Sequence, residues 1–435
     1  MILKVKLCNV AGIKNEMELS FLASKNDKKN MSSVYINKDN LWINRIVGII
    51  AGNAHGKTTI LDALASVGSF IELPLKKKNM PSLNDFEMKE YKDEYKEIIF
   101  KQMVSEFTSL ELPDSNKLNN NENSKIEIEM YIETLDDDMT DGYYKYMLEY
   151  NEKYREDGIK SEALYYKPKY NKLYNKIFEI HDSFESEIGY KIAYEKNYVN
   201  ELISNNINTS DFERKIKYYK TFIKHYNKDS NIICADNYVF PEFYLINKLD
   251  NYDDMLSLLQ FVKLADDNIK EIFVMKNEKN DPKLMFKYDG FTLHYSMIST
   301  ATQKLVAMAY SMLNSNKYNG VLLIDEFDNS LNLEISKFLI ELFSKREKSL
   351  SQLIFTTNNP EILDDMRRDQ IFLILKEKYD LTAVNFYNFI DPTTNRRVRN
   401  DFSFVKAYKK NVIENFPSEK LKEQLNFTFL KKNNY

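Results

Sequence analysis

A nine-residue segment, AGNAHGKTT at 51–59, constrains the fold more than any other part of the sequence. The apolar run INRIVGII (43–50) precedes it and is short enough to form one buried strand. A helical pattern follows it, with Ile60, Leu64 and Val67 on one face. A glycine-containing turn between a buried strand and an amphipathic helix is typical of a phosphate-binding loop in an α/β fold.

Triphosphate binding needs backbone N–H groups in a concave turn, a helix N-terminus that faces the anion, and a lysine that reaches the outer phosphates. Gly52 and Gly56 permit the tight backbone, and Lys57 supplies the cation. The Thr58 hydroxyl can ligate Mg²⁺. Ala51 replaces the usual first glycine and fits only with a negative φ. The predicted nucleotide contacts are Gly52, Asn53, Ala54, His55, Gly56, Lys57, Thr58 and Thr59.

The segment VLLIDEFDNSL (321–331) supplies the second half of such a site. An apolar strand that ends in Asp-Glu places a carboxylate at the sheet edge beside the phosphate loop. There Asp325 can hold Mg²⁺ through water, and Glu326 can polarise the attacking water. The alternative is that Asp325 and Glu326 only begin a turn after a buried strand.

Alternating apolar residues predict an N-terminal β-hairpin, with strands Ile2–Leu7 and Met17–Phe21, followed later by an antiparallel meander. Residues 170–264 have a largely helical pattern without sustained heptads. The strands of the meander are expected at 126–132, 143–150 and 161–166.

The last third of the chain alternates between helices and strands, which favours a parallel sheet covered by helices. The expected elements are helix Gln303–Leu313, strand Val321–Ile324, helix Glu334–Phe343, strand Leu353–Thr356, a short helix after Pro360 and strand Ile371–Leu375. We therefore expect an α/β P-loop fold in three parts. These are an N-terminal lobe with the phosphate loop (1–75), a β-meander and helical insertion (76–264), and a C-terminal lobe with the carboxylate strand (265–435).

Composition narrows the class of protein. The formal net charge of −4 gives no strong field that would draw the whole chain to nucleic acid. The two cysteines, Cys8 and Cys234, lie far apart without metal-ligand spacing, which fits a reducing compartment. The N-terminus lacks the apolar stretch of a signal peptide, and no uncharged run approaches the roughly 20 residues of a membrane span. We expect a cytoplasmic protein with no membrane partner.

With both motifs in place, the chain resembles the ABC/SMC-type AAA-family ATPases of bacterial antiphage and abortive-infection systems, including those of the PARIS, Septu and OLD-like systems. The resemblance runs from the first hairpin to the C-terminal segment, and the insertion matches only in general layout. It is carried by the turn Asn9–Ile13, AGNAHGKTTILDAL (51–64), SMISTATQKL (296–305), VLLIDEFDNSL (321–331), QLIFTTNNPEIL (352–363) and RNDFSFVKAYKKNVIENFP (399–417).

The segment SMISTATQKL resembles the counterpart of the ABC signature, which in such ATPases caps the nucleotide held by the other subunit. The resemblance therefore implies that Ser299 and Thr302 act in trans, in a homodimer or larger ring whose composite sites hold ATP and Mg²⁺. A hydroxyl cluster at a helix N-terminus suits that role. The alternative is that Ser299 and Thr300 only cap the helix that follows, and both interpretations can hold together.

Two residues depart from the family pattern. Ala301 replaces the signature glycine, which removes backbone freedom near the phosphate. Asn358 occupies the usual switch-histidine position, and its amide can donate a hydrogen bond to the γ-phosphate but cannot carry a proton near neutral pH. With Lys57 and Glu326 as the other predicted catalytic residues, we expect an ATPase with slow turnover.

The resemblance also implies a sensor or regulator that assembles on ATP and controls a separately encoded effector, for which a Toprim-type nuclease is one candidate. The implied trigger is a phage protein or a nucleic acid. Two other functions stay open at this point. One is a DNA-repair ATPase of the SMC or RecF kind, and the other is a catalytically silent scaffold that binds ATP.

Overall fold

The computed structural model describes residues 1–52, 56–78, 122–134, 140–150, 159–181, 209–226, 246, 252–276, 282–318, 320–345, 350–377, 380–391, 396–397 and 405. Asn53, Ala54 and His55, and all but one residue of the segment 399–417, lie outside the described residues. The helices are α1 (Lys57–Lys78), α6 (Thr209–Tyr226), α9 (Tyr252–Val262), α10 (Thr300–Tyr318) and α11 (Leu333–Ser344), with short 3-10 turns η1 (Met31–Ser33), η3 (Tyr295–Met297), η4 (Pro360–Ile362), η5 (Arg368–Gln370) and η6 (Phe386–Asn388).

The sheet that positions the predicted site has five strands in the order β13–β14–β5–β15–β16. The first four are parallel, and β16 pairs antiparallel with β15 at the edge. The parallel sheet predicted from the strand–helix alternation is therefore confirmed. Its strands are β5 (Ile46–Ala51), β13 (Val321–Ile324), β14 (Gln352–Thr357), β15 (Ile371–Glu377) and β16 (Asp380–Asn385).

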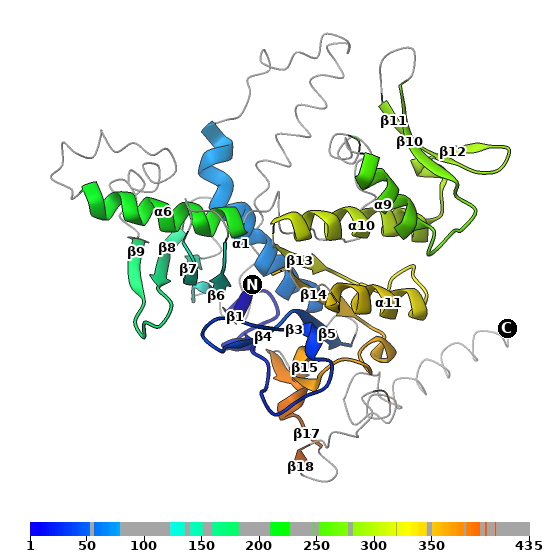
Figure 1. Cartoon of the computed structure of the whole chain (residues 1–435). Helices are drawn as coiled ribbons and strands as arrows, with labels where there is room; N and C mark the ends of the chain where they lie inside the picture. The colour runs from blue at the N-terminus through cyan, green and yellow to red at the C-terminus, as the bar shows by residue number, and fades with distance from the viewer. Residues whose placement is uncertain are drawn as a thin grey trace, which may run out of the picture.

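Both faces of the parallel sheet are buried, because apolar side chains alternate between two cores along each strand. In β5, Val47 and Ile49 join the core that contains α1, whereas Ile46 and Ile50 join the core that contains α10 and α11. Figure 1 shows α1 and α11 close to this sheet. Burial on both sides explains why the strand is almost continuously apolar.

A second sheet has six strands, all antiparallel, in the order β2–β1–β6–β7–β8–β9. Helix α6 lies beside β6–β9 (Figure 1), and its Phe222 stacks on Tyr144 and Tyr146 of β7. The predicted hairpin and meander thus form one layer. The strands are β1 (Ile2–Cys8), β2 (Met17–Ser20), β6 (Ser124–Ile132), β7 (Gly142–Tyr150), β8 (Ile159–Lys167) and β9 (Asn175–His181).

Two predictions are wrong in detail. The apolar run 43–50 is not one strand, because the chain changes partners at Arg45, whose N–H donates to Ser33 O (2.9 Å) and whose carbonyl accepts from Leu353 N (2.8 Å). The first half of the run therefore belongs to a separate hairpin of β3 (Val34–Ile36) and β4 (Trp42–Asn44). The second half is β5.

The largely helical interpretation of 170–264 is also wrong at its start, where β9 completes the antiparallel sheet. Ile177 and Phe178 are consecutive and both buried, so period-two alternation is interrupted and the strand is hidden in the sequence. Other strands were not predicted. They are the edge strand β16, the small sheet of β10 (Glu271–Lys276), β11 (Pro282–Lys287) and β12 (Thr292–His294), and the short pair β17 (Ile390–Asp391) and β18 (Arg396–Arg397).

Helix α10 packs on two cores at once. Leu305 and Met308 belong to the core of the parallel sheet, whereas Val306 and Ala309 belong to a core that includes Phe286 of β11. Figure 1 shows α9 and α10 next to the small sheet β10–β11–β12, which stands apart from the two larger sheets. The helix is therefore a rigid connection between the small sheet and the parallel sheet.

The side-chain amide of Gln352 joins the two larger sheets. Its Oε1 accepts from Ile2 N (2.7 Å), and its Nε2 donates to Ile2 O (3.0 Å) and to Asn44 O (2.8 Å). Gln352 is fully buried. The amide therefore satisfies backbone groups of the first strand in the way a neighbouring peptide group would.

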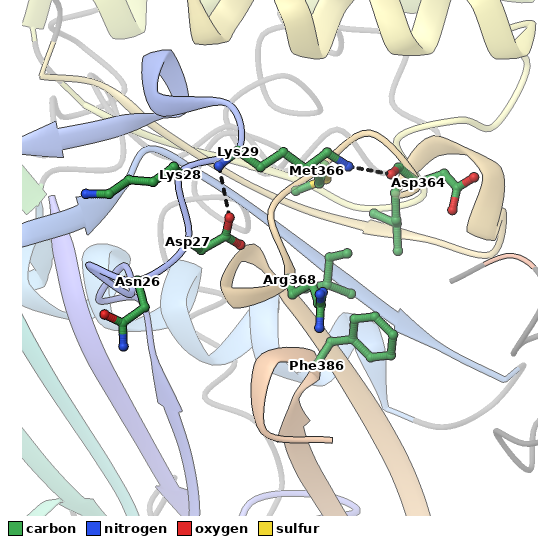
Figure 2. Close-up of a pocket in the computed structure, with 10 residues that line it drawn as sticks. Asn26, Asp27, Lys28, Lys29, Asp364, Met366, Arg368 and Phe386 are labelled. Atoms are coloured by element: carbon green, nitrogen blue, oxygen red, sulfur yellow. Dashed lines mark hydrogen bonds between the residues drawn. The ribbon is translucent and has the colours of Figure 1, made fainter. Parts of the chain in front are cut away.

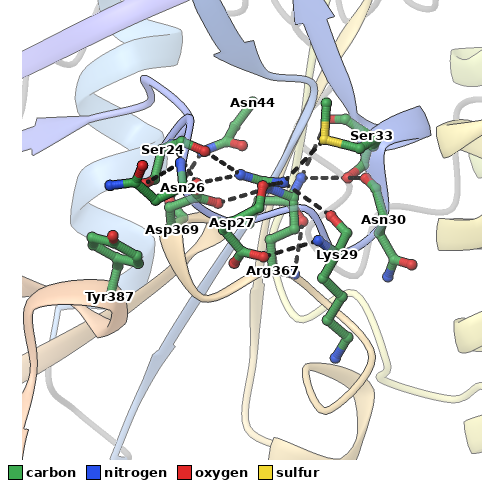
Figure 3. A network of polar contacts seen from close by, with 12 residues as sticks. Ser24, Asn26, Asp27, Lys29, Asn30, Ser33, Asn44, Arg367, Asp369 and Tyr387 are labelled. Atoms are coloured by element: carbon green, nitrogen blue, oxygen red, sulfur yellow. Dashed lines mark hydrogen bonds and ion pairs between the residues drawn. The ribbon is translucent and has the colours of Figure 1, made fainter. Parts of the chain in front are cut away.

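Arg367 is 0% exposed and stabilises the edge of the parallel sheet at which β15 begins. Its guanidinium makes a bidentate ion pair with Asp369, at 3.0 and 2.7 Å. Its other N–H groups donate to the carbonyls of Ser24 (2.9 Å), Asp27 (2.6 Å) and Lys29 (2.9 Å). Figure 3 shows Arg367 at the centre of these contacts, which hold the loop after β2 in place.

A pocket of about 330 Å³ shares Asp27 and Lys29 with this network (Figure 2). Lys29 Nζ donates there to the carbonyl of Asp364 at 2.9 Å. Ile371, the first residue of β15, also lines the pocket. Because β15 runs parallel to β5, the pocket lies at the sheet edge opposite the phosphate loop and is separate from the predicted nucleotide site. Within the described part of the chain, no helix has the length and apolarity needed to cross a bilayer.

Replacing Arg367 by methionine should destabilise the fold, because the Asp369 carboxylate would stay buried without its cation. Breaking a buried ion pair in this way costs about 3–5 kcal/mol, and we expect Arg367→Met to lower the free energy of unfolding by that amount in urea denaturation. Arg368→Met is the matched control, because that side chain is only partly buried. Its expected cost is at most about 1 kcal/mol. Equal losses in both variants would contradict this account of Arg367.

Candidate nucleotide site

Three segments meet at the carboxyl-terminal edge of the parallel sheet. Strand β5 ends at Ala51, β13 ends at Ile324 and β14 ends at Thr357, and all three run in the same direction. The phosphate loop, the Asp-Glu pair and Asn358 follow these strands directly. Parallel strands therefore bring the predicted residues to one edge, which is where open α/β sheets bind ligands.

Lys57 is buried at this edge, and its ammonium donates to three oxygens. These are Ala51 O (3.1 Å), Gly52 O (3.2 Å) and Asn358 Oδ1 (2.6 Å). Burial lowers the pKa of Lys57, and nearby carboxylates, with Asp325 the strongest, oppose that shift. Two of the predicted catalytic residues, Lys57 and Asn358, are thus in direct contact.

The phosphate loop and the carboxylate strand are joined by a hydrogen bond from Thr58 Oγ1 to Asp325 Oδ2, at 2.7 Å. Thr356 in β14 donates to the other oxygen of Asp325 and accepts from Glu326 N at 2.8 Å. Asp325 is buried, whereas Thr58 is exposed. A hydroxyl and a carboxylate are therefore held together at an accessible position. Thr356 was not predicted as a site residue, although two threonines directly after an apolar run are a recognisable signal.

Glu326 has a φ of +45°, which is uncommon for a residue other than glycine. Its carbonyl accepts from Lys304 Nζ (2.6 Å) and from Asn329 N (2.9 Å). The Asn329 side-chain amide also donates to Glu326 Oε2, at 3.2 Å. Asp325 and Glu326 therefore begin a turn at the same sheet edge as the phosphate loop, and their roles towards Mg²⁺ and water stay predictions.

Gly56 has a φ of +69°, which explains why the loop needs glycine there. A Cβ on Gly56 would lie 2.4 Å from Leu381 Cδ1, and a Cβ on Gly12 would lie 2.7 Å from the same atom. One methyl group of β16 thus touches both the first hairpin and the phosphate loop. Ala51 ends β5 in a strand conformation, as an alanine at this position requires.

Ser299 and Thr302 lie at the start of α10. Ser299 Oγ accepts from Thr302 N (3.1 Å), and the two hydroxyls are 2.7 Å apart, so the helix-capping interpretation is confirmed for Ser299, whereas Thr300 is the first residue of the helix. Ser299 is exposed, whereas Thr302 is 1% exposed. Their role in trans stays a prediction. Thr59 is partly buried in the first turn of α1.

A family model described as "AAA domain, putative AbiEii toxin, Type IV TA system" matches residues 46–364. That match covers most of the chain and every segment of the site. The chain belongs to this AAA domain family. It is thus an α/β P-loop protein with an AAA domain of the ATPase type, and the matched region contains the segments of the predicted site. No curated protein matches the chain.

Solved structures similar to this AAA protein include heads of SMC proteins. One is an SMC head bound to the C-winged helix domain of ScpA, with 12% identity, 88% of this chain and 97% of that chain covered, and a TM-score of 0.44. The SMC head from Thermotoga maritima has 11% identity, coverage of 88% and 98%, and a TM-score of 0.38. A Pyrococcus furiosus head bound to the C-terminal domain of ScpA has 14% identity, coverage of 94% and 98%, and a TM-score of 0.41.

The side chains at the AAA site fit Mg²⁺, which prefers oxygen ligands. The Thr58 hydroxyl and the Asp325 carboxylate are the donors that the contact above brings together. Among the described residues, no group of three or more His, Cys, Asp or Glu could hold a metal ion. A site with few protein ligands suits Mg²⁺, because this ion keeps several waters and binds substrate phosphates.

Gly56→Ala should destabilise the AAA domain through its backbone, because alanine at this φ costs about 1–2 kcal/mol. Trimming Leu381 to alanine removes the steric contact but leaves the strain, so the double variant should stay less stable than Leu381→Ala alone. Gly12→Ala is the matched control, because it meets the same methyl group without a positive φ. Its defect should disappear with Leu381→Ala in urea denaturation. Full recovery of both glycine variants would contradict the backbone explanation.

Proposed function

We propose that this AAA protein binds and hydrolyses ATP with Mg²⁺ as the regulatory ATPase of an antiphage, abortive-infection defence system. The nucleotide part is carried by the Thr58–Asp325 hydrogen bond, because it joins the phosphate loop to the carboxylate strand. The family match supports ATP as the ligand. The defence role is supported by the family description, which names an AbiEii toxin and a type IV TA system.

In this proposal the Lys57 ammonium leaves the loop carbonyls and Asn358 and binds the outer phosphate oxygens of ATP. Backbone N–H groups from Gly56 into α1 face the phosphates at the positive end of the helix dipole. Thr58, and Asp325 through water, would hold Mg²⁺, which would neutralise phosphate charge. Glu326 polarises the attacking water from the next position of the same turn.

Asn358 is the residue that we expect to limit the rate of ATP hydrolysis. Its Oδ1 accepts from Lys57, and we expect its Nδ2 to turn towards a phosphate once that lysine has moved. An amide orients the γ-phosphate but takes up no proton near neutral pH. We therefore expect slow turnover and a long-lived ATP-bound state.

The ATP-bound state is proposed to be an assembly, a homodimer or larger ring in which Ser299 and Thr302 of one copy cap the nucleotide of the next. The insertion at 76–264 is proposed to present the surface for a separately encoded effector, with a Toprim-type nuclease as one candidate. The trigger would be a phage protein or a nucleic acid. Co-purification with a protein encoded beside it would support this role, and consistent absence of such a partner would count against it.

Phosphate release by the purified chain tests the ATPase. Lys57→Ala is expected to abolish ATP binding and turnover, because the outer phosphates lose their cation. Glu326→Gln should keep ATP binding and lower turnover by about 10²–10⁴-fold. Glu334→Gln, an exposed carboxylate in the first turn of α11, is the matched control and should leave turnover unchanged. ATP bound through Lys57 without any turnover would instead indicate a scaffold.

Asn358→His should raise turnover by about tenfold or more, because an imidazole can exchange a proton near neutral pH. The same substitution should shorten the lifetime of the ATP-bound assembly, measured by gel filtration in ATP. Asn358→Ala, which removes the amide without adding a titrating group, is the comparison and should not accelerate turnover. Unchanged turnover and assembly in Asn358→His would contradict the proposed role.

A further inference from the structure

Glu326 is held in an unusual backbone conformation by groups from three parts of the chain. Its N–H donates to Thr356 of β14, and Asn329 in the following turn donates to its carbonyl. Lys304 of α10 donates its ammonium to the same carbonyl at 2.6 Å. A left-handed φ at a residue other than glycine persists only when surrounding contacts fix it. Lys304 is the charged member of that set.

Lys304 sits on a helix that reaches from this turn to a different part of the molecule. Val306 and Ala309, within two turns of Lys304, pack in the core of the small sheet β10–β11–β12. The segment that enters α10 is accessible, since Met297 is 70% exposed and Ser299 and Thr300 are also exposed. A displacement of the small sheet or of this segment therefore moves α10, and with it the Lys304 ammonium.

We propose that Lys304 is a positioning residue that couples the position of α10 to the backbone of Glu326. The inference rests on the proposed function in one respect, the role of Glu326 in polarising water. When the ammonium lies on the carbonyl, the turn keeps the left-handed conformation of Glu326 that the structure shows. When α10 shifts, the charge-assisted hydrogen bond is lost and the turn relaxes out of its left-handed conformation. Contacts made at the exposed start of α10 thereby regulate hydrolysis.

The physical reason lies in what Lys304 contacts. The ammonium bonds to the backbone of Glu326, so its loss changes the direction of the carboxylate without removing a phosphate ligand. Lys57, Thr58 and Asp325 make their own contacts with one another and with Thr356 and Asn358, and none of those bonds passes through Lys304. Loss of Lys304 should therefore affect turnover and leave nucleotide affinity nearly intact.

The test compares Lys304→Met with Lys304→Arg, which keeps a cationic donor, and with Lys337→Met on α11. Lys337 is a matched control because it is a helical lysine whose ion pair with Asp365 (3.3 Å) lies on the surface. Amide hydrogen exchange is measured on the full-length chain without nucleotide. Lys304→Met should speed exchange at Phe327, Asn329 and Leu331 by about tenfold, while the strands of the parallel sheet stay protected.

Kinetics complete the test. Lys304→Met should lower kcat by about 10–100-fold and leave the dissociation constant of ATP within about twofold, whereas Lys304→Arg should recover most of the rate. Unchanged exchange in the 327–331 turn, or a loss of ATP affinity as large as the loss of rate, would overturn the proposal. If the unmodified chain has no turnover, the proposed function fails, but the exchange result still decides whether Lys304 holds the turn.

Discussion

Strand β5 has no face exposed to solvent, and the position of every site residue depends on this burial. Ile46 and Ile50 pack in one core and Val47 and Ile49 in the other, so a slip of β5 by one residue would move each set into the core that the other set fills. The end of the strand at Ala51 is therefore fixed. The loop that follows must turn within a few residues to start α1, which is why a glycine with a φ of +69° stands at position 56.

The same sheet explains how residues far apart in sequence become one site. Thr356 is the junction, since its hydroxyl contacts both Asp325 and the backbone of Glu326. Asp325 in turn contacts Thr58, and the Glu326 carbonyl contacts Lys304. Four elements, α1, β13, β14 and α10, are thereby connected through polar contacts at one edge. A displacement of any one of these elements is therefore expected to move Asp325 or Glu326.

Much of the fold follows from patterns that the sequence displays openly. Continuous apolar runs predicted β13 with its exact bounds and β14 and β15 to within two residues, because strands buried on both faces leave little room for polar residues. The glycine and lysine spacing predicted the phosphate loop, and the Asp-Glu pair after an apolar strand predicted the residue that contacts Thr58. These signals are local, so one sequence is enough to find them.

The features that were missed depend on tertiary contacts. In the sequence Arg45 looks like part of one strand. In the structure its N–H donates to Ser33 and its carbonyl accepts from Leu353, so the chain changes partners there. Strand β9 hides its alternation because Ile177 and Phe178 are both buried in the core under α6. Lys304 and Leu381 act on residues 22 and more than 300 positions away. The signature-like segment that contains Lys304 gives no indication of its contact with the Glu326 carbonyl, and the residues around Leu381 carry no motif.

The amide of Gln352 has a consequence for how the protein is made. It pairs with the backbone of Ile2 across 350 residues. These two backbone groups of Ile2 therefore gain their side-chain partner only late in synthesis. At about 5–20 residues per second, that interval is roughly 20–70 s. The apolar side chains of the N-terminal hairpin share a core with α1 and α6, which are made much earlier. The packing of the hairpin can therefore precede the hydrogen bonds that join its first strand to the parallel sheet.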